Sequence, residues 1–163
     1  MSGLLAALPQ ADMGLLASAA VVYGVGRLVP TYDMGWYKAL RKPSWNPPNW
    51  VFPAVWLPLK LLQSVALWLV CKTAPDNQSL ALPVAAFGIH LALGNAWNTT
   101  FFGRHKMQES LKVMGTFWAS IAATISAFSF VNPLAAWLMV PTQVWVTIAS
   151  KLNYDIVKLN TKP

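Results

Sequence analysis

A short hydrophilic segment, residues 36–50, contains most of the side chains suited to binding a ligand. Rings, prolines and cations alternate along it, and an apolar run follows directly. Each proline fixes its own backbone angle and restricts the residue before it, so the segment holds a shape without regular structure. We therefore expect a stiff aromatic lid over a buried cavity, formed by Trp36, Tyr37, Pro43, Trp45, Pro47 and Trp50.

Helical spacing groups further candidates into three faces, because residues three and four positions apart lie on one side of a helix. If the faces converge, they line one pocket. The alternative is that the tryptophans anchor helix ends at the membrane interface, which fits Trp36, Trp45 and Trp50 better than the deeper Trp56 and Trp145. The faces are Phe52, Trp56 and Lys60; His90, Gly94, Trp97 and Phe101; and Pro141, Trp145, Ala149 and Asn153.

Lys60 is the most unusual candidate, because a charge is costly in the middle of an apolar span. Either its side chain reaches water or backbone carbonyls, as long cations do in membranes, or its ammonium meets a ligand carboxylate. Glu109 is a poor partner. Counting about 1.5 Å per residue along the two helices separates it from Lys60 by roughly 10 Å in depth.

His90 also lies near the middle of an apolar span. We interpret it as a hydrogen-bonded packing residue; the alternative is an axial ligand to a metallated tetrapyrrole. Cys71 is the only cysteine, so we expect no intrachain disulfide and no cysteine-ligated zinc site. We also expect no required cofactor, with a tetrapyrrole as the ligand. The sequence offers no acid/base pair or activated nucleophile, and conventional hydrolysis or group transfer is unsupported.

The elements that position these residues are membrane helices. The chain has 163 residues, 56% hydrophobic and 10% charged, with a mean hydropathy of +0.45, which leaves too few charges to cover a water-soluble globule. Five apolar stretches approach the roughly 20 residues needed to cross a bilayer. We predict an all-α bundle of five transmembrane helices forming one domain over residues 1–163, with helices at about 10–29, 51–71, 79–102, 107–130 and 133–156.

The cations indicate the orientation of this bundle. The net charge of +7 is scattered among helix ends instead of forming a basic stripe, so we do not expect nucleic acid binding. Lys and Arg favour the cytoplasmic side, and ten of the 12 fall on one predicted face, with Lys72 opposite and Lys60 inside a span. We expect the aromatic loop and the C-terminus in the cytosol, in an organellar or bacterial membrane. The ten are Arg27, Lys38, Arg41, Lys42, Arg104, Lys106, Lys112, Lys151, Lys158 and Lys162.

Three stretches together resemble the TSPO/MBR family of translocator and tryptophan-rich sensory proteins. The resemblance covers nearly the whole chain, and its loop motif is highly specific. The matching residues are Trp36-Tyr37, Leu40, Lys42 to Trp45, Pro47-Pro48, Trp50 and Val55-Trp56; Leu91 to Leu93, Ala96-Trp97 and Phe101 to Gly103; and Ala135-Ala136, Pro141, Trp145, Ala149 and Leu152 to Tyr154.

The resemblance implies a five-helix bundle, often dimeric, that binds porphyrins, sterols or synthetic drugs under the first loop. It implies ligand contacts by the residues of the loop and the three faces, with Arg27 as a further cation for propionates. It also implies light-dependent porphyrin degradation in some bacterial members, at positions matching Trp56 and Trp145 with Trp36 nearby. A weak sterol motif would be Leu152, Tyr154 and Lys158.

The chain departs from the family pattern around the pocket. Lys60 stands where Tyr is usual, and Thr142 replaces the Tyr that normally follows Pro141. His90 and Gly94 occupy common Gln and Asn positions, and Glu109 replaces a bulky residue of animal members. Losing two phenols while gaining a cation and an imidazole favours an anionic, metallated or metal-free ring over a neutral drug or sterol.

These observations leave four functional hypotheses. The leading one is a membrane receptor, sensor or chaperone that binds a tetrapyrrole in an aromatic pocket. The others are a porphyrin-degrading enzyme driven by light, a sterol transporter, and a structural subunit whose small-residue first helix packs against a partner in a dimer or a larger membrane assembly.

Overall fold

The computed structural model describes residues 12–28 and 32–161, and within these ranges the regular structure is entirely helical. Six α-helices are present there, with one 3₁₀ turn at Gly26–Leu28 after the first and one π-helical turn at Thr99–Gly103 after the fourth. The helices are α1 (Met13–Val25), α2 (Met34–Ala39), α3 (Val51–Thr73), α4 (Asn77–Asn98), α5 (Met107–Ser129) and α6 (Pro133–Asn160).

Polar side chains set several of the helix starts by accepting hydrogen bonds from free backbone amides. Asp33 accepts from the amide of Trp36 at 2.9 Å and thereby begins α2. Asp76 does the same for α4, and Asn132 for α6, where Pro133 follows as the first helical residue. The connections before α4 and α6 are therefore short and well defined, which keeps consecutive helices antiparallel.

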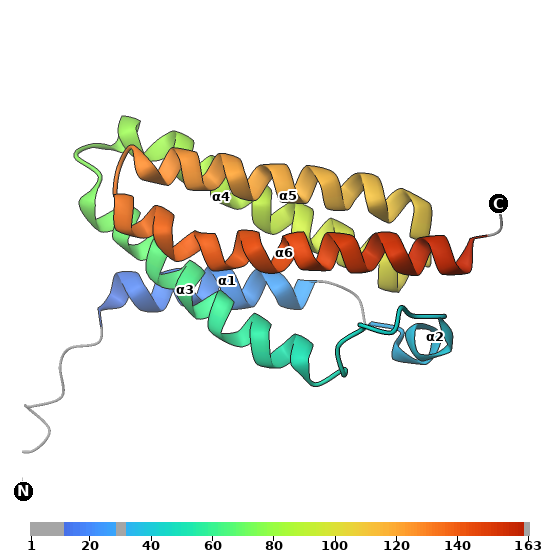
Figure 1. Cartoon of the computed structure of the whole chain (residues 1–163). Helices are drawn as coiled ribbons and strands as arrows, with labels where there is room; N and C mark the ends of the chain where they lie inside the picture. The colour runs from blue at the N-terminus through green and yellow to red at the C-terminus, as the bar shows by residue number, and fades with distance from the viewer. Residues whose placement is uncertain (1–11, 29–31, 162–163) are drawn as a thin grey trace, which may run out of the picture.

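The five long helices run side by side, with α2 set apart at one end (Figure 1). This end also holds the turn from α4 to α5 and the end of α6, whereas the other end holds the start of α1 and the turns α3–α4 and α5–α6 (Figure 1). α5 packs against α4 and α6, and α3 packs against α1 and α6. The main core contains Phe87, Ile121, Phe128 and Met139, each at most 2% exposed.

The helical class is confirmed, and three of the five expected spans are long and apolar enough to cross a membrane: Val51–Thr73, Asn77–Gly103 and Met107–Ser129. α1 is apolar, but it covers only 13 described residues, against the predicted 10–29. α6 is long but carries polar side chains and several charges, among them Lys151 and Asp155, and it extends to Asn160 instead of ending near 156.

The expectation of a first loop without regular structure is wrong, because α2 occupies residues 34–39. Asp33 caps this helix, and it ends before Pro43 at Leu40, whose backbone is extended. A capped turn of helix satisfies the amides that an irregular loop would leave to water. The prolines therefore shape only the second half of the segment.

Candidate ligand-binding site

A cavity of about 440 Å³ lies between α1, α2, α3 and α4, with one ring contributed by α5. Seven of the residues proposed from sequence line it: Tyr37, Phe52, Trp56, Lys60, His90, Gly94 and Trp97. The lining also includes residues that the sequence analysis did not select, among them Val22, Val25, Gly26, Tyr32, Met34, Asn49, Pro53, Gln63, Leu91, Asn95, Asn98, Phe102 and Phe117. Helical periodicity could have predicted two of these residues, because Gln63 follows Lys60 by three positions and Asn98 follows Gly94 by four, which places each on a face already selected.

The α3 wall places one cation among apolar and amide side chains. Lys60 is partly buried, and its Nζ lies 5.6 Å from the centroid of the Tyr23 ring on α1. The Tyr23 hydroxyl in turn donates to the carbonyl oxygen of Leu57 at 3.0 Å, which ties α1 to α3 beside Lys60. One turn further along, the buried Gln63 donates to Thr142 Oγ1 at 3.1 Å and joins α3 to α6.

The α4 wall is built around His90, which is 2% exposed. Its ring stacks parallel to Phe117 at 6.1 Å and meets Phe87 edge-on at 4.9 Å. Its Nδ1 is buried without a hydrogen-bond partner among the described residues, so the expected hydrogen bonding is missing at that nitrogen. A buried polar atom of this kind is costly unless it is satisfied.

Two further α4 residues, near the C-terminal end of the helix, attach this wall to α1 and α6. Trp97 lines the cavity and donates through Nε1 to Asn153 Oδ1 on α6 at 2.9 Å. Asn95 donates to the carbonyl oxygen of Val25 at 2.7 Å, which satisfies a backbone acceptor at the end of α1. Gly94 lies beside them, and a Cβ at this position would lie 3.2 Å from the Phe117 ring. The lack of a side chain at Gly94 therefore keeps part of the cavity open.

The lid over the cavity is α2 with the segment that follows it. Tyr37 is 4% exposed, and its hydroxyl donates to Asn46 Oδ1 at 3.2 Å. Burial raises the pKa of the Tyr37 phenol above its ordinary value, so the group stays a neutral hydrogen-bond donor. Lys42 Nζ lies 4.7 Å from the Tyr37 ring centroid and donates to the carbonyls of Lys38 and Leu40. Desolvation lowers the pKa of Lys42.

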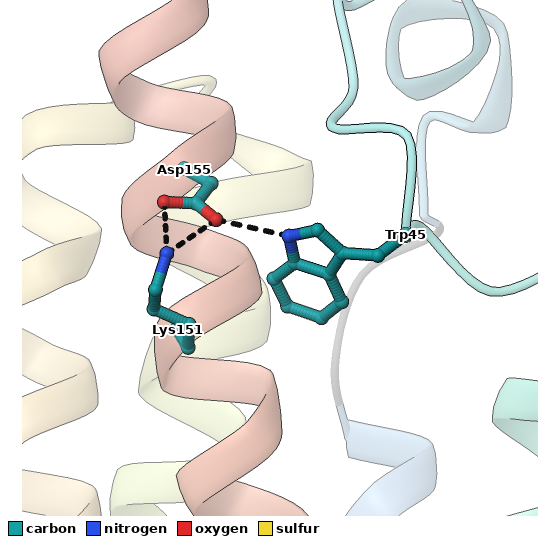
Figure 2. Close-up of polar contacts among 3 residues, drawn as sticks. All are labelled: Trp45, Lys151 and Asp155. Carbon is teal, nitrogen blue, oxygen red and sulfur yellow. Dashed lines mark hydrogen bonds and ion pairs between the residues drawn. The ribbon is translucent and has the colours of Figure 1, made fainter.

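The second half of the lid is fastened to α6. The Arg41 amide donates to Asn160 Oδ1 at 2.9 Å, and Asn160 Nδ2 donates back to the Arg41 carbonyl at 2.7 Å. Figure 2 shows the second fastening, in which Trp45 Nε1 donates to Asp155 Oδ2 at 3.1 Å while Lys151 holds both oxygens of that carboxylate. Trp45 therefore contacts α6 instead of the cavity.

The first half of the lid rests on the turn between α4 and α5. The Trp36 ring stacks on His105 with centroids 4.2 Å apart, and His105 Nε2 lies 3.3 Å from Asp33 Oδ2. His105 adopts a left-handed backbone with φ of 56°, a conformation that is uncommon outside glycine. This turn presents the imidazole to α2, so both halves of the lid have their own attachment to the bundle.

Several residues proposed as ligand contacts lie away from the main cavity. The third predicted face does not reach it: Pro141 is exposed, and Trp145, whose ring is T-shaped to Phe52 with centroids 6.1 Å apart, does not line the cavity. Ala149 lines a separate pocket of about 30 Å³. The side chain of Arg27 lies outside the described residues. Trp36, Pro43, Trp45, Pro47 and Trp50 belong to the lid without lining the cavity, and Trp50 is 70% exposed.

A sequence model of the TspO/MBR family matches residues 13–159. The chain belongs to the TspO/MBR family. Among its relatives is the tryptophan-rich sensory protein of Cereibacter sphaeroides, 38% identical over 77% of each chain. Protein CrtK of Rhodobacter capsulatus is 37% identical over 77% of this chain and 78% of its own. The human translocator protein is 32% identical over 91% of this chain and 85% of its own.

The remaining family features have a definite place in the fold. Of the weak TspO/MBR sterol motif, Leu152 is buried, whereas Tyr154 is 51% exposed and Lys158 is exposed. These three side chains therefore do not form one surface. The described residues contain no group of three His, Cys, Asp or Glu side chains placed to hold a metal ion. His90 is the histidine among the residues that line the cavity.

The fastening to α6 predicts that Asn160→Ala loosens the lid of this TspO/MBR protein. The substitution removes both hydrogen bonds to Arg41, each worth about 1 kcal/mol, so we expect amide hydrogen exchange in residues 40–47 to rise several-fold. Exchange in α3 should not change. Tyr154→Phe is the matched control, because it alters an exposed side chain on the same helix. Equal exchange in Asn160→Ala and the unsubstituted protein would show that the clamp does not hold the lid.

Proposed function

We propose that this protein is a membrane receptor or sensor that binds a tetrapyrrole, with protoporphyrin as its simplest representative. The observation that carries the proposal is the 440 Å³ cavity, whose walls include the rings of Phe52, Trp56, Trp97 and Phe117. Such rings stack on a flat macrocycle, and binding pockets of this size and apolar lining suit small molecules. Membership in the family of tryptophan-rich sensory proteins supports a sensing role.

We further propose that all five long helices cross the membrane with the lid in the cytosol. The lid, the α4–α5 turn and the helix segments next to them carry Lys38, Arg41, Lys42, Arg104, Lys106, Lys112, Lys151 and Lys158, whereas Lys72 lies in the last turn of α3. The lid and the end of α3 lie at opposite ends of the bundle (Figure 1). Cys71, the only cysteine, is exposed beside Lys72. A membrane-impermeant maleimide should therefore label Cys71 from the non-cytosolic side, and Lys158→Cys in a Cys71→Ser background from the cytosol. The reverse labelling pattern would contradict this orientation.

Porphyrin binding is tested by tryptophan fluorescence of the purified protein in mild detergent. Bound protoporphyrin lies against Trp56 and Trp97, so we expect saturable quenching with micromolar or better affinity. Trp56→Phe should weaken binding, whereas Trp137→Phe should not, because Trp137 is 71% exposed and does not line the cavity. Unchanged emission at saturating porphyrin, together with no effect of Trp56→Phe on binding, would refute the proposal.

The geometry favours binding over light-driven degradation. The degradation hypothesis needs Trp56 and Trp145 at one porphyrin, but Trp145 is not among the residues that line the cavity. Trp145 Nε1 is nevertheless buried without a partner among the described residues. Illumination with protoporphyrin under air decides between the two functions: bleaching that is equally fast in the Trp56/Trp145 double variant would exclude degradation by these residues.

A further inference from the structure

We propose that Lys60 makes the cavity selective for ligands that carry a carboxylate. This inference rests on the proposed function, and it names the chemical class within it: a planar, mostly apolar ring system with an acidic group at its edge. The uncharged residues of the cavity wall would pack against the ring system of the ligand.

The first line of support is that no acidic side chain of the protein pairs with Lys60. The whole sequence contains five acidic residues, and none of them lines the cavity. Each has another partner. Asp12 lies 3.6 Å from Lys72, Asp33 contacts His105, Asp76 caps α4, Glu109 lies 3.0 Å from Lys106, and Asp155 is held by Lys151 and Trp45.

The second line of support is the surroundings of the ammonium group. Its described neighbours are the Tyr23 ring, with the centroid 5.6 Å away, and Gly26, where an added Cβ would collide with Lys60 Nζ. An aromatic face attracts a cation, but it does so more weakly than a hydrogen-bonded carboxylate. Because Lys60 forms no ion pair with any described residue, an anion entering the cavity is the group that would neutralise it.

The third line of support is the arrangement of polar groups along the cavity. Two other polar side chains on its α2 and α3 walls are already engaged: Gln63 donates to Thr142, and Tyr37 donates to Asn46. A ligand carboxylate therefore finds a strong, unengaged donor at Lys60. A neutral sterol, drug or ester would leave that partly buried cation unpaired, which lowers the affinity of the neutral ligand relative to the acid.

The test compares protoporphyrin IX, which has two propionic acids, with its dimethyl ester. Affinities are measured by tryptophan quenching in detergent for the unsubstituted protein, Lys60→Gln and Lys60→Tyr, the last of which replaces the ammonium group with a neutral phenol. We expect the unsubstituted protein to prefer the acid by about tenfold or more, as for hydrogen bonds to charged groups. Both variants should bind acid and ester about equally. Lys72→Gln, which removes a cation at the opposite end, should keep the preference.

A second variant tests the position of the cation while keeping its charge. Gly26→Ala adds a methyl group that would clash with Lys60 Nζ and displace it, so it should reduce the preference for the acid several-fold. Equal affinity of the unsubstituted protein for acid and ester, or an undiminished preference in Lys60→Gln, would overturn the assignment while leaving porphyrin binding intact. Failure of both porphyrins to bind would instead refute the proposed function itself.

Discussion

Gly94→Leu is expected to weaken protoporphyrin binding at least about tenfold, equivalent to about 1.4 kcal/mol, and is the largest single effect on ligand affinity that we predict. Gly94 lines the cavity, and even a Cβ there would lie 3.2 Å from the Phe117 ring. A leucine side chain has to occupy the space that the ligand would use, or push Phe117 aside. Since Leu is the better helix former by about 0.8 kcal/mol, α4 should remain folded.

Gly88→Leu is the matched control for this substitution. Gly88 lies on the same helix and is exposed, and a Cβ added to it would have no described heavy atom within 4 Å. The two variants thus share the change in composition and helix propensity, but only one fills the cavity. Quenching titrations with protoporphyrin measure both. Full affinity in Gly94→Leu would mean that the ligand binds elsewhere.

Asn153→Ala is expected to give the largest loss of stability. Asn153 is 2% exposed and joins three helices, because it accepts from Trp97 on α4 and exchanges hydrogen bonds with Ser110 on α5. Interhelical bonds in membrane proteins contribute about 0.6 kcal/mol each, and the truncation adds a cavity and leaves the partly buried indole N–H of Trp97 unpaired. We expect the free energy of unfolding to fall by about 2 kcal/mol.

The comparison variant for this prediction is Ser110→Ala. It removes the hydroxyl that bonds to Asn153 but leaves the contact between Asn153 and Trp97, so it should lower the free energy of unfolding by less than Asn153→Ala does. Denaturant titration in detergent measures both. Porphyrin affinity should fall in Asn153→Ala alone, because Trp97 lines the cavity. An Asn153→Ala protein as stable as the unsubstituted one would show that the three-helix junction is not a source of stability.

Helical periodicity predicts several of the residues that line the cavity. Phe52, Trp56 and Lys60 repeat every four residues, as do His90 and Gly94, and the structure places all five on the cavity wall. The same reasoning grouped Pro141, Trp145 and Ala149, which do not reach the main cavity. Periodicity identifies residues that share a face, but not the neighbour that this face meets, and on α6 the face meets Phe52 and the small pocket instead.

In the lid, too, the sequence predicted the general character of the segment but not the contacts of its individual side chains. Its proline and aromatic content predicted a stiff segment, and the residues are indeed held by many contacts. Which side chains face the ligand did not follow from that content. Trp45 is bound to Asp155, 110 residues later in the chain, and Trp36 stacks on His105. Such pairs depend on how distant helix ends meet, and no local pattern encodes this.

The sequence by itself determined the family, the helical class and the apolar spans, because hydrophobic length, periodicity and the spacing of the tryptophans are properties of the chain read in order. Only the tertiary structure decided that α1, α3 and α4 enclose the cavity, that Trp145 stands outside it, and that Lys60 lies in it while all five acidic residues are engaged elsewhere. The physical reason is that charge pairing and enclosure depend on distances between helices, which are fixed by packing.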